Sequence, residues 1–209
     1  MIGKKRVERL MQQQGLQGRV VQVTRRQPGL KRFIERGDNL RLNKPSPVDI
    51  NRVWVADITY IKVRETYKYL TVIMDLYSRR ILSWSLTDTR TTQDTAVVLK
   101  RAIKERQPDE GLIFHTDRGI EFTGKGFRNV LEQHKMKFSV NRLGYCTDNG
   151  HMESYFHSLK AELIRGRKFN TMKELRYALN SYINHFYNNK RLHSGIGYCS
   201  PIEYEKIAA

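Results

Sequence analysis

The sequence has too few cysteines for a disulfide-stabilised scaffold or a cysteine-rich zinc protein. Cys146 and Cys199 are the two cysteines among 209 residues, and both kinds of protein need more. Long apolar runs are missing as well, since no stretch approaches the ~18 apolar residues that span a bilayer. No apolar segment follows the basic N-terminus, which argues against a secretory signal. These absences predict a protein of a reducing, cytoplasmic compartment that makes no contact with a membrane.

Acidic residues are scarce relative to basic ones. The chain has 38 Lys and Arg against 21 Asp and Glu, a net charge of +17 and a pI of about 10.0. Such an excess is either solvated or matched by a polyanion, of which nucleic acid is the commonest. Charge alone does not separate this class from heparin-binding or chromatin-like proteins. The hydrophobic content of 39% is enough for a buried core, so disorder throughout is excluded.

The positive charge is concentrated in the first fifth of the chain. Residues 1–44 hold twelve Lys or Arg and three acidic residues. Lys4–Gln14 has a helical pattern that ends at Gly15. Val20–Val23 has the composition of a short strand, and Arg25–Arg41 is basic with little periodicity. This segment is either a solvated arm or a DNA-contacting appendage.

A linker separates the basic segment from the rest of the chain. Asn43–Asp49, "NKPSPVD", has two prolines, which neither a helix nor a central strand accommodates well. We therefore predict a basic N-terminal segment with its linker over residues 1–47 and a core domain with a C-terminal helical tail over 48–209.

Hydrophobic periodicity predicts five strands and four helices in the core. The first three strands are joined by short polar turns, which favours an antiparallel meander. Alternating helices and strands after a meander imply an α/β fold with a mixed sheet and helices on its faces. The predicted strands are Arg52–Val63, Tyr67–Ser78, Arg80–Asp88, Gly111–Asp117 and Lys137–Val140, and the predicted helices are Thr91–Arg106, Gly124–Lys135, Asn149–Ile164 and Thr171–Asn188.

Three carboxylates lie at positions that together suggest a site. Asp57 interrupts an apolar strand and shares a face with Val53 and Val55, where an ionised group is costly unless it is paired. Asp117 ends a later strand, and Glu153 lies in the first turn of a helix, with Asp148 or Asn149 as its expected cap. Each alone has an ordinary alternative, namely a sheet-end aspartate, a turn aspartate and a glutamate that favours the helix dipole.

Convergence of the three carboxylates would create a metal site. If the first and fourth strands are neighbours, Asp57 and Asp117 point at one spot, and the later helix can bring Glu153 there. Converging carboxylates stay ionised when a divalent cation holds them, and hard oxygen ligands suit Mg²⁺ or Mn²⁺. On a strongly basic protein the natural substrate is a phosphodiester. Two such ions ~4 Å apart can activate an attacking oxygen and stabilise a leaving one.

The motifs resemble those of the DDE transposases and retroviral-type integrases. Thirty-five residues separate Asp117 from Glu153, and Lys160 follows seven residues later. The resemblance is strongest to bacterial insertion-sequence transposases of the OrfB type, over about residues 54–204. It is carried by "WVADITYI", "DLYSRRILSW", "FHTDRGIEF", "GYCTDNGHMESYFHSLKAEL" and "YINHFYNNKRLHSGIGYCSPIEY". It implies an RNase H-like fold with a five-stranded mixed sheet and helices on both faces.

The resemblance also implies roles for individual residues. Asp57, Asp117 and Glu153 correspond to the DDE triad and would bind Mg²⁺ or Mn²⁺, with two ions expected. Lys160 corresponds to the helix-borne basic residue that contacts DNA. Other candidate DNA contacts, with solvated surface charge as the alternative for each, are His157, Arg118 and Arg142.

Two further groups of side chains have competing interpretations. His115 alternates onto the face of Asp117, either as a group that supports the site or as a buried structural histidine. Cys146 and His151 are two potential zinc ligands, too few for a zinc site.

The predicted function is that of a DNA transposase. It would cut the ends of an insertion sequence and join the freed 3′-hydroxyl to target DNA, acting as a homo-oligomer on nucleoid DNA in the bacterial cytoplasm. Alternatives are an RNase H-like nuclease that only hydrolyses and a DNA-binding derivative without catalysis. Relatives usually carry helix-turn-helix segments before the core, and only "GKKRVERLMQQQGL" resembles the last of them. A separate N-terminal DNA-binding subunit is therefore an expected partner. Thr147 and Gly150 replace a tyrosine and an alanine of many relatives.

Overall fold

The computed structural model describes residues 3–16 and 37–208. The chain divides into two compact units, Met1–Leu30 and Lys31–Ala209. In the first unit the helix α1 spans Lys4–Gln13, and the chain turns at Gly15, whose φ of 64° favours glycine. The predicted helix is thereby confirmed.

Two predictions for the basic segment cannot be compared with the fold. The expected strand at Val20–Val23 and most of Arg25–Arg41 lie outside the described residues. The described residues 37–47 belong to the second unit.

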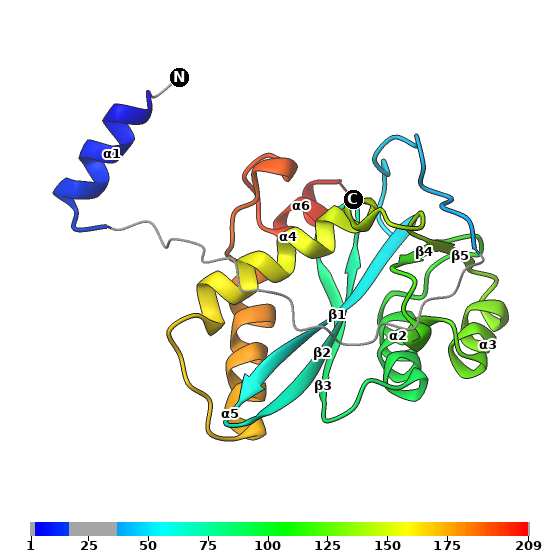
Figure 1. The fold of residues 1–209 in the computed structure, drawn as a ribbon. Coiled ribbons are helices and arrows are strands. Elements are labelled where there is room, and N and C mark those ends of the chain that lie inside the picture. Colours follow the sequence, from blue (N-terminus) through cyan, green and yellow to red (C-terminus); the bar gives the residue numbers. More distant parts are fainter. Residues whose placement is uncertain (1–2, 17–36, 209) are drawn as a thin grey trace. The chain divides into compact units, whose positions relative to one another are not determined.

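The second unit is built on one mixed sheet of five strands in the order β3-β2-β1-β4-β5 (Figure 1). The first three strands form the predicted antiparallel meander, and β4 and β5 add to β1 in parallel. The predicted mixed sheet and its strand pairing are therefore confirmed. The strands span Val53–Val63 (β1), Thr66–Asp75 (β2), Ile81–Thr87 (β3), Ile113–Thr116 (β4) and Lys137–Val140 (β5).

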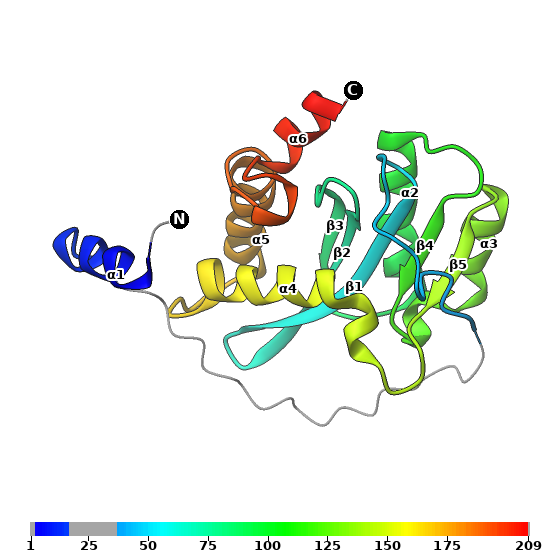
Figure 2. The same cartoon turned by 90° about the horizontal axis from the view of Figure 1, so that it is seen from above.

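Helices cover both faces of this sheet, as Figure 2 shows in a view from above. Even-numbered residues of β1, such as Trp54 and Ala56, pack with α2 and α3 in one buried cluster. Odd-numbered ones, such as Val53 and Val55, pack with α4 and α5 in the other. The strand period of two thus divides the core into two layers. The helices span Thr92–Arg106 (α2), Lys125–Gln133 (α3), Gly150–Leu159 (α4), Met172–Asn180 (α5) and Pro201–Ala208 (α6).

The two long helices of the layer that contains Val53 and Val55, here called the second layer, end in wider π-helical turns. Lys160–Ile164 continues α4 and Ser181–Tyr187 continues α5, both as π-helical turns without a break in helical dihedrals. The predicted long helices are therefore confirmed in extent, and Thr171 caps α5 through its hydroxyl. π-turns insert a residue into a helix and are frequent near functional sites.

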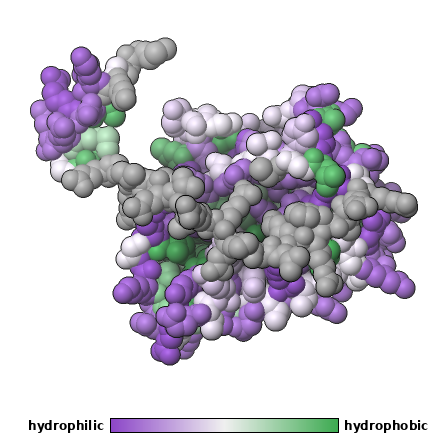
Figure 3. Space-filling view, viewed as in Figure 1, coloured by the Kyte–Doolittle hydropathy of each residue, from purple (hydrophilic) through white to green (hydrophobic). Residues whose placement is uncertain are grey.

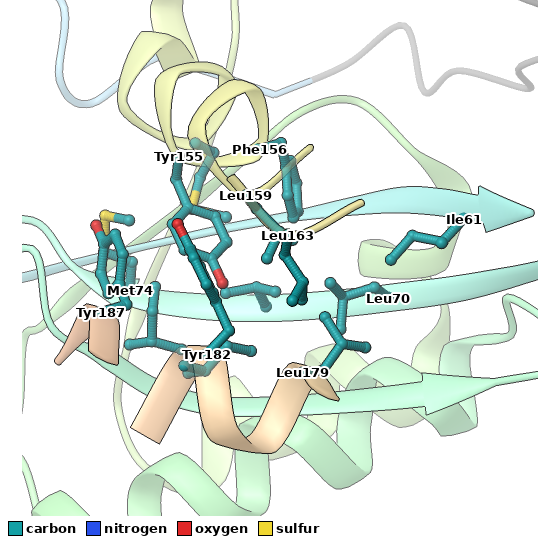
Figure 4. Close-up of a cluster of buried hydrophobic side chains, with 14 of the residues drawn as sticks. Ile61, Leu70, Met74, Tyr155, Phe156, Leu159, Leu163, Leu179, Tyr182 and Tyr187 are labelled. Carbon is teal, nitrogen blue, oxygen red and sulfur yellow. The ribbon is translucent and has the colours of Figure 1, made fainter. Parts of the chain in front are cut away.

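Aromatic and aliphatic side chains of these helices form the core of the second layer. Tyr155, Phe156 and Leu159 of α4 meet Leu179 of α5 over the sheet (Figure 4). Leu159 and Leu179 are fully buried. Because this face of α4 is committed to packing, its opposite face is left for polar groups.

A buried ion-pair network fastens the C-terminal helix α6 to the sheet edge. Glu205 accepts hydrogen bonds from Arg106 at 2.9 Å, from Arg80 at 2.7 Å and from the Ser78 hydroxyl at 2.8 Å. Burial raises the pKa of Glu205, but the bonds from Arg106 and Arg80 outweigh it and lower the pKa overall. The network connects α6 to α2 and to the turn between β2 and β3.

Replacement of Glu205 by glutamine is expected to destabilise the core unit, because Arg106 would remain almost buried without its charge partner. We expect a loss of about 2 to 3 kcal/mol in the free energy of unfolding, measured in urea. Glu105→Gln is the control, since Glu105 is 51% exposed and meets only Arg80 at 3.3 Å. That variant should lose less than about 0.5 kcal/mol. Equal losses in the two variants would contradict a dominant role for the buried network.

Candidate active site

Asp57 lies within β1 and Asp117 directly follows β4, at the point where the parallel pairing of these two adjacent strands ends. The last residue pair between β1 and β4 is Ala56 with Thr116, so Asp57 is the next residue of β1 and Asp117 is the first residue after β4. Both are half-buried and fall on the α4 side of the sheet by the alternation of side chains. The neighbourhood of the first and fourth strands, which the sequence only assumed, is confirmed.

Backbone amides hold both carboxylates at this edge. Asp57 Oδ1 accepts from the Ile58 amide at 2.7 Å, and Asp117 Oδ1 accepts from the Gly119 amide at 2.9 Å. A Cβ at position 119 would lie 2.9 Å from Asp117 Oδ1, so the absence of a side chain lets the chain turn close around the carboxylate.

Glu121 is a nearby acid that the sequence analysis missed. A Cβ at Gly119 would also lie 2.7 Å from Glu121 Oε2, so Glu121 and Asp117 flank the same small space. Glu121 is nearly buried and pairs with Arg90 at 3.2 Å. Its position in the 3₁₀ turn Ile120–Phe122 has no clear signal in the sequence, where it looks like a surface glutamate.

The start of α4 is tied to β1 by a buried side chain. Asn149 donates from Nδ2 to the Ala56 carbonyl at 3.0 Å, one residue before Asp57. Neither Asn149 nor Asp148 caps the helix through a side chain, so the predicted cap is wrong. The amide is used instead to fix the helix against the strand end. Glu153, an exposed residue one turn further along, is thereby held at the same end of the sheet.

The loop before α4 is anchored at both ends. Asp148 accepts from the Arg142 guanidinium at 2.9 Å, from its amide at 2.8 Å and from Asn39 at 2.8 Å. The Asn141 amide bonds to Thr116. The tip of the loop around Tyr145, between these two anchored ends, is exposed.

Two candidate residues have structural contacts in the fold. Arg118 is 8% exposed and donates to the Asn141 carbonyl at 2.7 Å and to the Gly37 carbonyl at 2.9 Å. His115 is buried between Ser139 at 2.8 Å and Asn141 at 2.9 Å, and burial lowers its pKa. Of the two interpretations of His115, the buried structural one is observed. The contacts of Arg118, and those of Arg142 with Asp148, favour a role in fixing the loop over a DNA contact.

Lys160 and His157 lie further along α4. The Lys160 ammonium lies 5.1 Å from the centre of the Tyr60 ring. Burial lowers the pKa of Lys160, while the nearby charge of Asp57 acts in the opposite direction. His157 is exposed on the same helical face as Glu153.

The donor set of this edge is that of a hard divalent cation. Asp57, Asp117 and Glu153 offer carboxylate oxygens only, the ligands that Mg²⁺ prefers. Within residues 3–16 and 37–208, however, no three acidic, histidine or cysteine side chains lie close enough together to hold a metal ion. The strands β1 and β4 thus bring Asp57 and Asp117 to one edge. The third carboxylate, Glu153, lies on the neighbouring helix α4. Across the same residues, no helix is long and apolar enough to cross a membrane.

Comparison with known proteins decides the family. The integrase core domain model matches residues 48–146, and a second integrase core domain model matches residues 153–207. The IS600 uncharacterized 31 kDa protein of Shigella sonnei is 32% identical over 213 residues, covering 100% of this chain and 78% of that protein. This chain belongs to the integrase core family of DDE transposases and integrases.

Other members of the integrase core family agree in sequence and in fold. The transposase for insertion sequence element IS904 of Lactococcus lactis subsp. lactis (strain IL1403) is 38% identical over 156 residues, covering 75% of this chain. The chain spans 62% of that transposase's length. The HTLV-2 integrase catalytic core domain in complex with magnesium, in a trimeric form, superimposes with a TM-score of 0.57 at 18% identity. The superposition covers 76% of this chain and 98% of the HTLV-2 chain. The RNase H-like fold is thereby confirmed.

Asp148 should make the stability of this protein vary with pH in the acidic range. The hydrogen bond from Arg142 lowers the pKa of Asp148 from 3.8 to about 2. A depressed pKa means that the stabilisation is present above pH ~4 and is lost as the pH falls towards 2. Because Arg142 is 41% exposed, we expect only about 1 kcal/mol. Urea unfolding of wild type and Asp148→Asn should differ by this amount at pH 6 and converge as the pH approaches 2. A constant difference would show that the charge of Asp148 is not responsible.

Proposed function

We propose that this chain is the catalytic part of an insertion-sequence transposase, which cuts DNA at the element ends and joins the 3′-hydroxyl to target DNA. The observation that carries the proposal is the pair Asp57 and Asp117 at the point where the parallel pairing of β1 and β4 ends, with α4 tied to the same point by Asn149. The named transposase relatives support the reaction.

Asp57, Asp117 and Glu153 would hold the metal ions of this site. When bound, Mg²⁺ would supply activation of the attacking oxygen and stabilisation of the leaving one. The magnesium in the HTLV-2 integrase core supports this choice, and Mn²⁺ has the same preference for oxygen ligands. Backbone amides of Ile58 and Gly119 orient the two aspartates before any ion arrives. Glu153 then has to approach the pair from the first turn of α4.

Basic side chains beside the carboxylates would hold the DNA backbone. Lys160 lies near the charge of Asp57 and would be available to a phosphate there. His157 shares the exposed face of Glu153. Arg118 and Arg142 act chiefly through the loop that they anchor. On the face shown in Figure 3 the visible described residues are mostly hydrophilic, with small separate apolar areas, which suits a polyanion better than a lipid surface.

The proposed partners are the two DNAs and other protein copies. Both element ends and target DNA have to be present for joining, so a homo-oligomer on DNA is expected, in keeping with the trimeric form of the HTLV-2 core. A separate N-terminal DNA-binding subunit would supply recognition of the ends. The proposed place of action is nucleoid DNA in the bacterial cytoplasm.

Removal of one carboxylate should abolish the reaction without abolishing DNA binding. Asp57→Asn, Asp117→Asn and Glu153→Gln are each expected to lose cleavage and joining with Mg²⁺, measured on labelled DNA that carries the element ends. Affinity for DNA comes mainly from Lys and Arg at phosphates and should stay close to wild type, with its steep salt dependence.

The control for these variants is Glu132→Gln, which removes an exposed helical glutamate on α3. It should leave both reactions unchanged. A triad variant with near wild-type activity would remove that residue from the proposed site. Cleavage by the wild type without joining of a pre-cut 3′-hydroxyl end would favour the hydrolytic nuclease, and absence of both reactions would favour the non-catalytic derivative.

Mg²⁺ should stabilise the wild type more than Asp57→Asn. An ion that binds only the folded state raises stability by mass action, and the variant lacks a ligand. Without metal, Asp57→Asn should melt no lower than wild type, because it removes a half-buried charge and keeps an oxygen for the Ile58 amide. Thermal melts with and without Mg²⁺ measure both effects. An equal gain from Mg²⁺ in the two proteins, together with a much lower melting temperature for the variant, would make Asp57 a structural residue.

A further inference from the structure

Arg79 is a basic residue in an unusual backbone position. It lies in the turn between β2 and β3 with a φ of 64°, a left-handed conformation that costs energy for any residue but glycine. The turn is fixed by buried Asp75, which accepts from the amides of Tyr77 and Ser78, and by the Arg79 amide, which bonds to the Asp75 carbonyl. The fold therefore fixes the backbone of Arg79, and with it the direction of its Cα–Cβ bond, in a conformation that costs energy.

No carboxylate of the described residues pairs with Arg79. Its guanidinium is half-buried, and burial lowers its pKa. Its hydrogen-bond partner is Nδ1 of His151, in the first turn of α4. The opposite side is formed by the chain at Gly195, where a Cβ would lie 3.9 Å from the guanidinium.

The groups that face Arg79 and His151 come from several elements and carry little negative charge. Burial is the main cause that lowers the pKa of His151, and the nearby charges of Arg79 and Arg41 lower it further. Arg191 is neutralised by Glu162 at 2.8 Å, and the pKa of His193 is lowered to about 4 by burial, Arg191 and Arg79. The N-terminal end of α4 adds the positive end of a helix dipole.

Aromatic rings pack next to the basic side chains around Arg79 and His151. Tyr187 packs edge-on against His193 at 4.8 Å and against Tyr155 at 4.9 Å. Tyr155 and Tyr187 are buried in the core of the second layer (Figure 4). The wall behind Arg79 is thus rigid, which reduces the entropy lost when a ligand is bound.

We propose that Arg79 and His151 form a binding site for a phosphate of the DNA backbone, on the side of α4 away from Glu153. A guanidinium binds phosphate with two parallel hydrogen bonds, and an exposed imidazole adds a third donor. The proposal rests on the proposed action on DNA and assigns one anchoring contact of that DNA. A carboxylate from a second copy of the chain has similar chemistry and is the alternative that the test separates.

The test measures binding of a labelled DNA duplex of unrelated sequence to the full chain, without Mg²⁺, over a series of NaCl concentrations. Arg79→Gly is the informative variant, because glycine accepts the left-handed turn while the guanidinium is removed. The slope of log affinity against log salt should fall by about 1, the value of one lost phosphate contact. Arg79→Lys keeps the charge and should keep most of the slope.

Arg101→Ala is the matched control. Arg101 is exposed on α2, in the other layer of the fold, and its removal deletes the same charge. Its slope should stay close to wild type. A fall of the same size in both variants would mean that only net charge matters and would overturn the site.

Two further outcomes are decisive. A folded Arg79→Gly protein with an unchanged slope overturns the proposal. An altered mass in sedimentation without DNA, together with an unchanged slope, assigns Arg79 to a contact between protein copies and overturns it as well. If Arg79→Gly melts well below wild type, Arg79→Asn replaces it, since asparagine also tolerates the left-handed region. Because no cleavage is read, a chain that fails to cut or join DNA still tests this site.

Discussion

The hydrogen bond from Asn149 to the Ala56 carbonyl is the interaction on which the geometry of the site depends. Ala56 precedes Asp57 on β1 and pairs with Thr116, which precedes Asp117 on β4. One buried amide therefore fixes the start of α4 to the point where both strands deliver a carboxylate. The packing of Phe156 and Leu159 sets the rotation of the helix, and the Asn149 bond sets its position along the strand. Without the bond, Glu153 would still be on a packed helix but would have no fixed distance to the two aspartates.

Charge in this molecule is divided between acids that hold the fold and bases that are left for a partner. Glu205, Asp148 and Glu162 each take hydrogen bonds from arginines, and all three have lowered pKa values. Because these acids are engaged inside the protein, they do little to offset the basic exterior. The chain keeps a net charge of +17, and basic side chains such as Arg79 contribute to it without a carboxylate partner among the described residues. That division explains how a stable α/β core can also present a strongly positive surface.

Preorganisation differs between the three carboxylates. Asp57 and Asp117 are half-buried and oriented by backbone amides, whereas Glu153 is exposed. The loop before α4 is tied by Asp148 at one end and Asn141 at the other. A site with two placed ligands and a third on an adjacent helix can stay open until substrate and metal arrive. Repulsion among three carboxylates is a physical reason for that arrangement in the free protein.

The sequence by itself determined the elements, their order and the identity of the three acids. Period-two runs and helical spacing are local signals, so the strands and the long helices were predicted within a few residues, and Asp57 stood out because a charge interrupts an apolar strand. The tertiary structure alone decided that β4 lies beside β1 and what the polar side chains bind. Asn149 looked like a helix cap and bonds to a strand 93 residues away. Arg118 looked like a surface charge and is buried on carbonyls, and Glu121 looked ordinary and lies beside Asp117. Hydrogen bonds of buried polar groups are satisfied by partners distant in sequence, and no local pattern encodes those partners.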